Sequence, residues 1–256
     1  MIEPRDLLTA VAVKNNGDWD KIYEAIRLKD FPSEEETVEI CSKIKSKVLT
    51  ALDKEYPEWL RRVYKPPFIL FYYGDLSLLQ NQDKNLAIVG SRDNTEYGKE
   101  TTFNLVKEIR ARYVVVSGLA RGIDSIAHEA AINNGGKTVG ILGSGIDKCW
   151  PSENLSIYKK MKKEHLVISE YPGTTEPNPK HFPMRNRLIA GISKAVLVTE
   201  AKERSGTLIT VGYALNASKD IMCVPYPIGS ESSCNRLISE GAYLVQSGQD
   251  IVDIMK

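Results

Sequence analysis

The chain has 256 residues, of which 42% are hydrophobic and 26% are charged, and its formal net charge at neutral pH is +1. This composition is typical of a globular protein and excludes a disordered or low-complexity chain. Because the net charge is so small, the field of the whole molecule does not attract nucleic acid. Any anion site therefore has to be a local cluster of cations.

Cysteine usage and the terminal sequence bear on cofactors and compartment. The cysteines at positions 41, 149, 223 and 234 are scattered and form no C-x-x-C pair, so we expect reduced thiols, no metal and no cofactor. The N-terminus lacks the apolar core of a signal peptide, and no apolar run approaches the ~20 residues of a membrane helix. We expect a cytoplasmic protein without a membrane partner.

Residues 1–55 are predicted to form a small helical domain, because apolar residues recur there at helical spacing. Ser33 followed by Glu36 resembles the capping box that begins a helix. A third apolar group ends the domain and comprises Val38, Ile40, Ile44, Val48 and Leu52. Two readings stay open, a packing appendage without a site and a DNA-binding module. Residues 56–85 are expected to be a connector with a short strand at 68–73.

From Leu86 onward the sequence alternates between strands and helices. The strands are continuous apolar runs, as expected for a parallel sheet covered on both faces. They are predicted at 86–90, 113–118, 138–143, 166–170, 195–200 and 220–225, with an edge strand at 243–246. Helices are predicted at 96–112, 123–133, 154–163, 184–193, 208–217, 235–240 and 250–255. This pattern predicts a doubly wound, mostly parallel, Rossmann-like α/β domain over residues 86–256.

The carboxyl ends of the predicted strands gather glycines, hydroxyl side chains and cations. One such loop alone is most often a tight strand-to-helix turn, but several on one face of a sheet indicate a site for phosphates. The residues that we expect to bind nucleic acid are Gly90, Ser91, Arg92, Gly118, Arg121, Gly143, Gly145, Lys148, Lys180, Phe182, Arg185, Asn186, Arg187, Ser205, Gly206 and Thr207. Phe182 either stacks on a nucleobase or plugs the core beneath its loop, and its cationic neighbours favour stacking.

Catalytic candidates are few. Asp124 and His128, four residues apart, form either a general base with its orienting group or a polar pair that fixes the start of a helix, and the second reading is favoured. His165 is expected at the surface. The run Gly143-Ser144-Gly145 lacks the third glycine of a dinucleotide fingerprint, and the sequence contains neither a P-loop nor a G-x-S-x-G elbow. We therefore expect a binding protein without catalytic residues.

Taken together, these motifs resemble the DprA/Smf family of DNA-processing proteins along nearly the whole chain. The matching residues include Tyr56-Pro57, Gly90-Ser91-Arg92, Ser117 to Asp124, His128, Leu142 to Gly145, Ser169-Glu170, Phe182 to Gly191, Glu200-Ala201, Ser205 to Thr210 and Gly241-Ala242. The resemblance implies a SAM-like N-terminal domain, an extended Rossmann-like domain and a homodimer. It also implies protection of incoming single-stranded DNA during natural transformation and loading of the RecA recombinase. In such proteins a basic pocket holds DNA phosphates, which nominates Arg92 with Lys180, Phe182, Arg185 and Arg187 around it.

The sequence departs from the family pattern in three places. Trp150 replaces a usual Tyr, and Tyr226 and Ser233 each replace a usual Gly, which bears on the loop at 226–234 more than on the DNA pocket. Longer relatives carry a C-terminal winged-helix domain, which we do not expect after Lys256.

Two further hypotheses accompany this reading. The loop Ser205 to Thr210 resembles that of nucleotide phosphoribohydrolases, but Thr210 stands at the position of their Glu, so a nucleotide-processing enzyme is the less favoured alternative. Apolar residues near the C-terminus, Ile238 and Leu244 among them, are expected to form a symmetric dimer surface.

Overall fold

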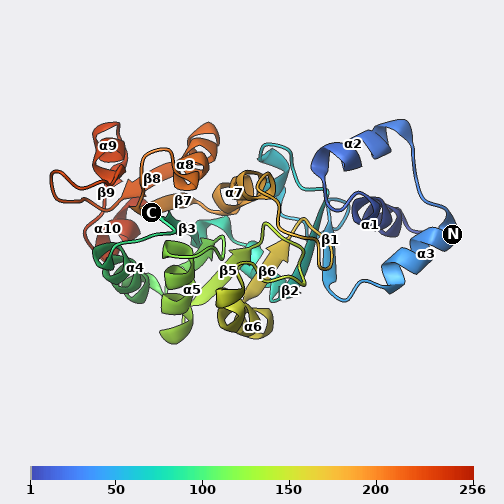
Figure 1. Ribbon diagram of the computed structural model, residues 1–256, viewed down its shortest axis with the longest axis horizontal. Helices are drawn as coiled ribbons and strands as arrows, with labels where there is room; N and C mark the ends of the chain where they lie inside the picture. The colour runs from blue at the N-terminus through green and yellow to red at the C-terminus, as the bar shows by residue number, and fades with distance from the viewer. Residues whose placement is uncertain (1) are drawn as a thin grey trace.

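The computed structural model describes residues 2–256, and within them nine strands form one mixed sheet (Figure 1). The strand order is β1-β2-β6-β5-β4-β3-β7-β8-β9, with antiparallel pairs only at β1–β2 and β2–β6. The strands are β1 (Lys47–Thr50), β2 (Ile69–Gly74), β3 (Asn85–Gly90), β4 (Val114–Ser117), β5 (Lys137–Ile141), β6 (Leu166–Ser169), β7 (Ala195–Glu200), β8 (Asp220–Cys223) and β9 (Tyr243–Leu244). The Rossmann-like, doubly wound α/β fold is thus confirmed.

Helices cover both faces of the parallel strands, and three more precede them. The α-helices are α1 (Pro4–Lys14), α2 (Trp19–Leu28), α3 (Glu34–Ser42), α4 (Glu96–Ile109), α5 (Ile123–Asn133), α6 (Leu155–Glu164), α7 (His181–Ile192), α8 (Gly206–Asn216), α9 (Cys234–Ser239) and α10 (Gly248–Ile254). Short 3-10 helices are η1 (Glu58–Arg62), η2 (Leu76–Leu79), η3 (Gln82–Lys84) and η4 (Ser152–Asn154). In Figure 1, α7, α8 and α9 lie on one side of the sheet and α4, α5 and α6 on the other.

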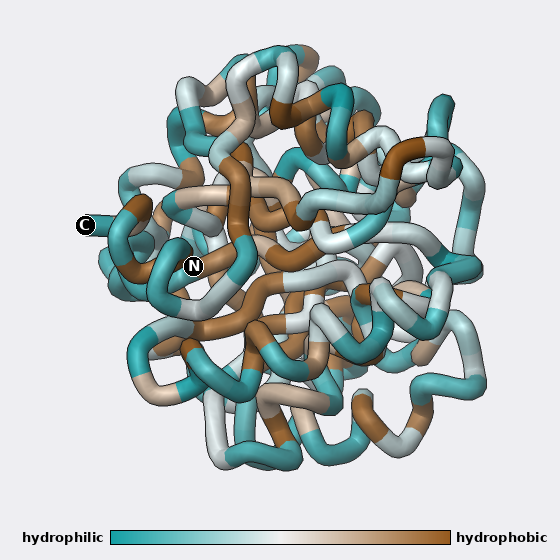
Figure 2. The backbone as a smooth tube through the Cα atoms, turned by 90° about the vertical axis from the view of Figure 1, so that its left-hand side faces the viewer, coloured by the Kyte–Doolittle hydropathy of each residue, from teal (hydrophilic) through white to brown (hydrophobic). Residues whose placement is uncertain are grey.

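Apolar strands supply the core. One cluster packs β3, β5 and β7 against α7 and α8, a second packs the other face of the sheet against α4, α5 and α10, and a third joins α1 and α2 to β2 and α6. Figure 2 shows the hydrophobic segments gathered along the central strands, with hydrophilic backbone around them. Burial on both faces explains why these strands read as continuous apolar runs.

The N-terminal segment differs from its prediction in one element. The third helix ends at Ser42, and residues 47–50 form β1, which pairs with β2. Val48 fits the helical spacing of the preceding apolar residues. As a strand, however, residues 47–50 pair with β2, which buries Leu49 and Thr50. This pairing also gives hydrogen-bond partners to the backbone groups along the edge of β2, which a helix would leave unpaired. One half of the predicted capping box of α3 is present, because the Ser33 hydroxyl accepts from the Glu36 amide at 3.2 Å.

The order of strands reverses between β3 and β7. The chain winds from β3 outward through β4, β5 and β6, then crosses to β7 and continues in the opposite direction through β8 and β9. In open α/β sheets such a switch point opens a crevice at the carboxyl ends of the two strands. Here those ends are Gly90 on β3 and Glu200 on β7, which lie in register.

Candidate nucleic-acid interface

A cavity of about 520 Å³ opens at the switch point between β3 and β7. It is formed by the loop after β3, the first turns of α7, and the loop that leads from β7 into α8. Nine of the predicted site residues line it, namely Gly90, Ser91, Arg92, Phe182, Arg185, Asn186, Ser205, Gly206 and Thr207. More than half of the predicted site residues therefore lie together at one cavity.

The N-terminus of α8 faces this cavity. Ser205 is its N-cap, yet no side chain caps the first turn, and the Ser205 hydroxyl is buried without a hydrogen-bond partner among the described residues. Nothing lies within 4 Å of the place where a side chain on Gly206 would begin. The first amides of an α-helix have no acceptor within the helix, and they carry its positive partial charge. This open helix end therefore offers amide donors to an anion.

Arg92 and Phe182 form the outer wall of the cavity. Arg92 is exposed, and its guanidinium carbon lies 5.4 Å from the centroid of the Phe182 ring. The ring is half-buried and packs against Gly143, where a Cβ atom would come within 2.7 Å of it. Phe182 thus combines both readings of the sequence: part of the ring seals the loop after β5, and part of it lines the cavity.

Arg185 supplies a buried positive charge beneath the cavity. Its guanidinium donates to the carbonyls of Gly118 and Ile141, and burial lowers its pKa to about 10, so it stays charged at neutral pH. The nearby Asp124 carboxyl accepts from the amides of Gly118 and Ala120, and burial raises the pKa of Asp124 against the opposing charge of Arg185. Because Arg185 is 4% exposed, its charge reaches the cavity through its field and is not open to direct contact.

Asn186 ties the cationic helix to the open helix end. Its side-chain oxygen accepts from the Arg185 Nε at 3.1 Å, and its amide donates to the carbonyl of Gly206 at 3.2 Å. α7 therefore fixes the position of the first residue of α8.

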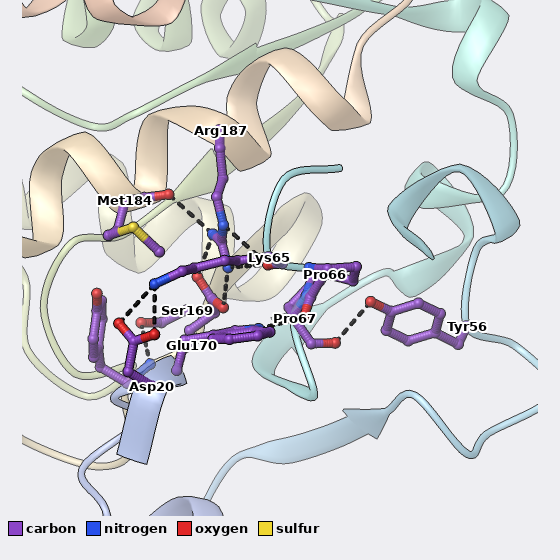
Figure 3. A network of polar contacts seen from close by, with 11 residues as sticks. Asp20, Tyr56, Lys65, Pro66, Pro67, Ser169, Glu170, Met184 and Arg187 are labelled. Carbon is purple, nitrogen blue, oxygen red and sulfur yellow. Dashed lines mark hydrogen bonds and ion pairs between the residues drawn. The ribbon is translucent and has the colours of Figure 1, made fainter. Parts of the chain in front are cut away.

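Arg187 lies outside the cavity, in a buried ionic network (Figure 3). Its guanidinium pairs with both carboxylate oxygens of Glu170, at 2.6 and 2.7 Å, and also donates to the carbonyls of Lys65 and Met184. The side chain is 1% exposed, so it cannot touch DNA in this conformation. Arg187 follows Arg185 by two positions on the helix, so the two side chains point about 200° apart around the helix axis. The motif alone does not show which of them faces the cavity.

The other predicted residues also lie outside the cavity lining. The Gly118 amide already donates to the Asp124 carboxyl, and a Cβ on Gly118 would collide with the Arg185 guanidinium. A Cβ on Gly145 would collide with the backbone of Gly173. These glycines therefore serve packing. The three lysine and arginine residues are at the surface: Arg121 pairs with Glu153, Lys148 pairs with Glu176, and Lys180 is exposed one residue before α7.

The histidines differ from expectation. His128 is fully buried, and its Nδ1 lies 2.7 Å from the Thr138 hydroxyl, whereas Asp124 bonds the Gly118 turn. Asp124 and His128 therefore form neither a catalytic dyad nor the predicted polar pair. His165 is 5% exposed, so its predicted place at the surface is wrong. The prediction rested on the polar residues that precede it, Lys163 and Glu164, but the packing of the α/β domain buries His165 itself.

Several lining residues were not in the predicted site. Lys202, Ile209 and Thr210 contribute to the cavity from the loop and first turns of α8. Gly206 and Thr210 are four residues apart, so they share one face of the helix. This spacing could have predicted from the sequence that Thr210 lies beside Gly206 in the cavity.

In residues 2–256, no cluster of three or more His, Cys, Asp or Glu side chains is arranged to hold a metal ion. None of the helices in that range combines the length and the apolar character needed to cross a bilayer.

A family model and a curated relative both relate the chain to DNA-processing proteins. The family model described as DNA recombination-mediator protein A matches residues 47–256. DNA processing protein DprA of Bacillus subtilis (strain 168) is 42% identical over 203 residues, which cover 78% of this chain and 68% of that protein.

Solved structures agree with the sequence comparison. The crystal structure of DprA from Streptococcus pneumoniae superposes with a TM-score of 0.84 and 33% identity, covering 99% of this chain and 98% of the other. DNA processing protein A from Helicobacter pylori, described for its single-stranded DNA binding mode, gives a TM-score of 0.75 at 27% identity, with 84% and 97% covered. A family match from β1 to the C-terminus, together with this fold, shows that the chain belongs to the DNA recombination-mediator protein A family, that of the DprA and Smf proteins.

Proposed function

We propose that the protein binds single-stranded DNA in the cavity between β3 and β7 and protects incoming strands during natural transformation. The observation that carries this proposal is the uncapped N-terminus of α8, which opens into a cavity that also holds Arg92 and Phe182. Membership of the DprA family supports it, as does the single-stranded DNA binding described for the Helicobacter pylori relative.

Each part of the cavity has a role in holding a strand. A DNA phosphate would accept from the first amides of α8, and the planar guanidinium of Arg92 would bind the same or the next phosphate. Phe182 would stack on a base, which is worth ~1–3 kcal/mol and is independent of base identity. Because these contacts address the backbone and the ring faces, binding would tolerate any sequence.

Assembly, the recombinase and the compartment belong to the same proposal. By family resemblance, the protein acts in the cytoplasm as a homodimer that loads RecA onto the bound strand. Ile238 on α9 is half-buried and Leu244 on the edge strand β9 is 45% exposed, so both are accessible to a second copy. Two linked cavities would bind a long strand more tightly without any new contact.

We propose no catalytic role. The phosphoribohydrolase alternative needs a carboxylate near the start of α8. The residue at that position is Thr210, which has no carboxylate and is 2% exposed. Release of free base from a nucleoside monophosphate by the purified protein would bring that alternative back.

The test is fluorescence anisotropy of labelled single-stranded and duplex oligonucleotides at several salt concentrations. We expect a preference for single strands, and we expect Arg92→Ala to weaken binding for all sequences and to reduce the slope of log K against log salt by about one. Arg121→Ala is the matched control, because Arg121 is an exposed cation outside the cavity. An unchanged slope in Arg92→Ala would remove Arg92 from the site, and no binding at low salt would contradict the function.

A further inference from the structure

A second groove lies between α7, the C-terminal half of α8 and the segment that follows η1. Its volume is about 430 Å³, which is within the range of small-ligand sites. The lining residues are Arg62, Val63, Tyr64, Arg187, Gly191, Tyr213, Asn216 and Ala217. None of them is among the residues of the switch-point cavity.

Two tyrosine rings form the aromatic wall of this groove. Tyr64 and Tyr213 have ring centroids 6.2 Å apart and ring planes 25° apart. Tyr64 is 59% exposed, which is unusual for a large aromatic side chain whose backbone is held by buried contacts. An exposed ring beside a partly buried one offers a surface on which a planar ligand can stack.

The backbone that carries Tyr64 is fixed from three sides (Figure 3). The carbonyl of Lys65 accepts two hydrogen bonds from Arg187, at 2.8 and 3.1 Å, and the Lys65 ammonium pairs with Asp20 at 2.6 Å. The next carbonyl, that of Pro66, accepts from the Trp19 indole at 2.7 Å. Lys65 has a φ of 47°, a left-handed conformation that persists only where surrounding contacts determine it. These contacts fix the backbone that follows Tyr64, whose ring is exposed.

Of the cations at the groove, Arg187 is paired with Glu170 and Lys65 beside it with Asp20, which leaves the charge of Arg62. Arg62 is exposed and makes no ion pair with any residue from 2 to 256, and the Lys65 ammonium lies 5.8 Å from the Tyr64 centroid. None of the lining residues carries a carboxylate. Cations interleaved with exposed aromatic rings suit a single-stranded nucleic acid, whose bases stack while its phosphates meet the cations.

The groove and the switch-point cavity share one wall element, helix α8. α8 contributes Gly206 and Thr210 to the cavity and Tyr213 and Ala217 to the groove, a spacing that places all four along one side of the helix. Seven residues separate Gly206 from Tyr213, about 10 Å along the axis. At roughly 3.4 Å per stacked nucleotide, this distance corresponds to about three nucleotides.

We propose that Tyr64 and Tyr213 form a second base-stacking subsite for the same strand whose phosphate is held in the switch-point cavity. Arg62 would bind a phosphate of that stretch, and the amide of Asn216 is placed to bond a base edge. The inference rests on the proposed function, because the strand reaches the groove only if the cavity holds it. Short oligonucleotides would fill the cavity alone, and longer ones would reach both places.

The test compares a two-residue oligothymidylate, too short to span the ~10 Å between the two places, with a twenty-residue one by anisotropy, using wild type, Tyr64→Ala, Tyr64→Phe, Tyr213→Ala and Arg62→Ala. We expect Tyr64→Ala and Tyr213→Ala to bind the long oligonucleotide about tenfold more weakly and the short one as wild type does. Tyr64→Phe keeps the ring and should bind both like wild type. Arg62→Ala should lower the salt slope for the long oligonucleotide only. A 5-iododeoxyuridine strand should photocrosslink to Tyr64 or Tyr213.

Two outcomes distinguish this inference from the proposed function. If wild type binds both oligonucleotides while the tyrosine variants lose nothing on the long one and no crosslink maps to the groove, the subsite is wrong and the cavity stands. If wild type binds neither oligonucleotide, the proposed function fails and the subsite fails with it. A change of oligomeric state in Tyr64→Ala, with unchanged DNA binding, would make the groove a protein contact and would also overturn the subsite.

Discussion

Gly143 shows at the scale of one residue how an absent side chain shapes the interface. The Phe182 ring occupies the space where a Cβ on Gly143 would lie, 2.7 Å from the nearest ring carbon. A methyl group there must displace the ring, and the ring in turn supports Arg92. A residue that never touches a ligand therefore sets the position of two that line the cavity.

We expect Gly143→Ala to weaken single-stranded DNA binding about tenfold, because the displaced ring no longer stacks on a base. Overpacking should also lower the free energy of unfolding by about 1–3 kcal/mol. Anisotropy and urea denaturation measure the two effects. Gly212→Ala is the control, since its Cβ meets nothing within 4 Å in the interior of α8, and it should raise stability by about 1 kcal/mol with DNA affinity unchanged. Wild-type affinity in Gly143→Ala would show that the ring has no part in binding.

The sequence motifs point to residues that line one cavity, but they do not separate these from residues that serve packing. Arg185 and Arg187 belong to one motif, yet their side chains lie in different places. Arg185 lies beneath the cavity, whereas Arg187 lies outside it and pairs with Glu170. Glycine likewise marks both an open backbone, as at Gly206, and a tightly packed contact, as at Gly145. Only the packing of neighbouring elements separates these cases, and that packing involves residues distant in sequence.

At the scale of elements, α5 and β5 enclose a histidine that cannot easily be protonated. The Thr138 hydroxyl donates to the carbonyl of Val115 at 2.8 Å, so it must accept from the His128 Nδ1–H. The Nε2 atom is then the unprotonated nitrogen, and it is buried without a partner among the described residues. Burial, aided by the charges of His165 and Arg185, lowers the pKa of His128 to about 3.

This pKa predicts a loss of stability in mild acid. An unfolded histidine titrates near 6.5, so between about pH 6.5 and 3 the unfolded chain binds a proton that the folded chain does not. Stability should be complete above pH 6.5 and should fall by about 2 kcal/mol from pH 6.5 to 5 on account of His128. Urea midpoints at several pH values measure it. His128→Asn keeps a donor toward Thr138 and should flatten the profile, and an equally steep profile in that variant would assign the loss to other groups.

The elements themselves were predictable where burial left a clear pattern. The strands that carry the cavity are mostly apolar because helices cover both of their faces, and their bounds differ from prediction by only a few residues. β1 was missed because four residues at a sheet edge, only half of them buried, leave no periodic signal. α7 begins at His181, three residues before its predicted start, since Pro183 is accepted in the first turn of a helix.

At the scale of the whole molecule, the C-terminal elements leave apolar side chains at one end of the sheet. Tyr243 and Leu244 on the edge strand β9 are 49% and 45% exposed, whereas Val245 and Ile251 pack inward. An edge strand with exposed apolar residues invites pairing with another chain.

We expect Ile238→Glu and Leu244→Glu each to shift the protein from dimer to monomer, because a carboxylate would be buried without a partner at a symmetric interface. Sedimentation velocity measures the shift, and Leu215→Glu on the exposed side of α8 is a control at 59% exposure. If both variants stay dimeric, the interface lies elsewhere on the surface. Lower affinity for long DNA with unchanged affinity for short DNA would accompany the monomer.

The antiparallel place of β2 has a consequence for synthesis on the ribosome. β2 ends at Gly74 and pairs on one side with β1, but its other neighbour, β6, begins at Leu166. At ~5–20 residues per second, β6 emerges roughly 5 to 20 seconds after β2. During that interval the apolar run Ile69–Tyr73 has one open edge, while β1 covers the other and places Lys47 at the outer rim. Until β6 emerges, the nascent chain can form at most a two-stranded ribbon with one unpaired edge, and the sheet closes around β2 only when β6 pairs with it.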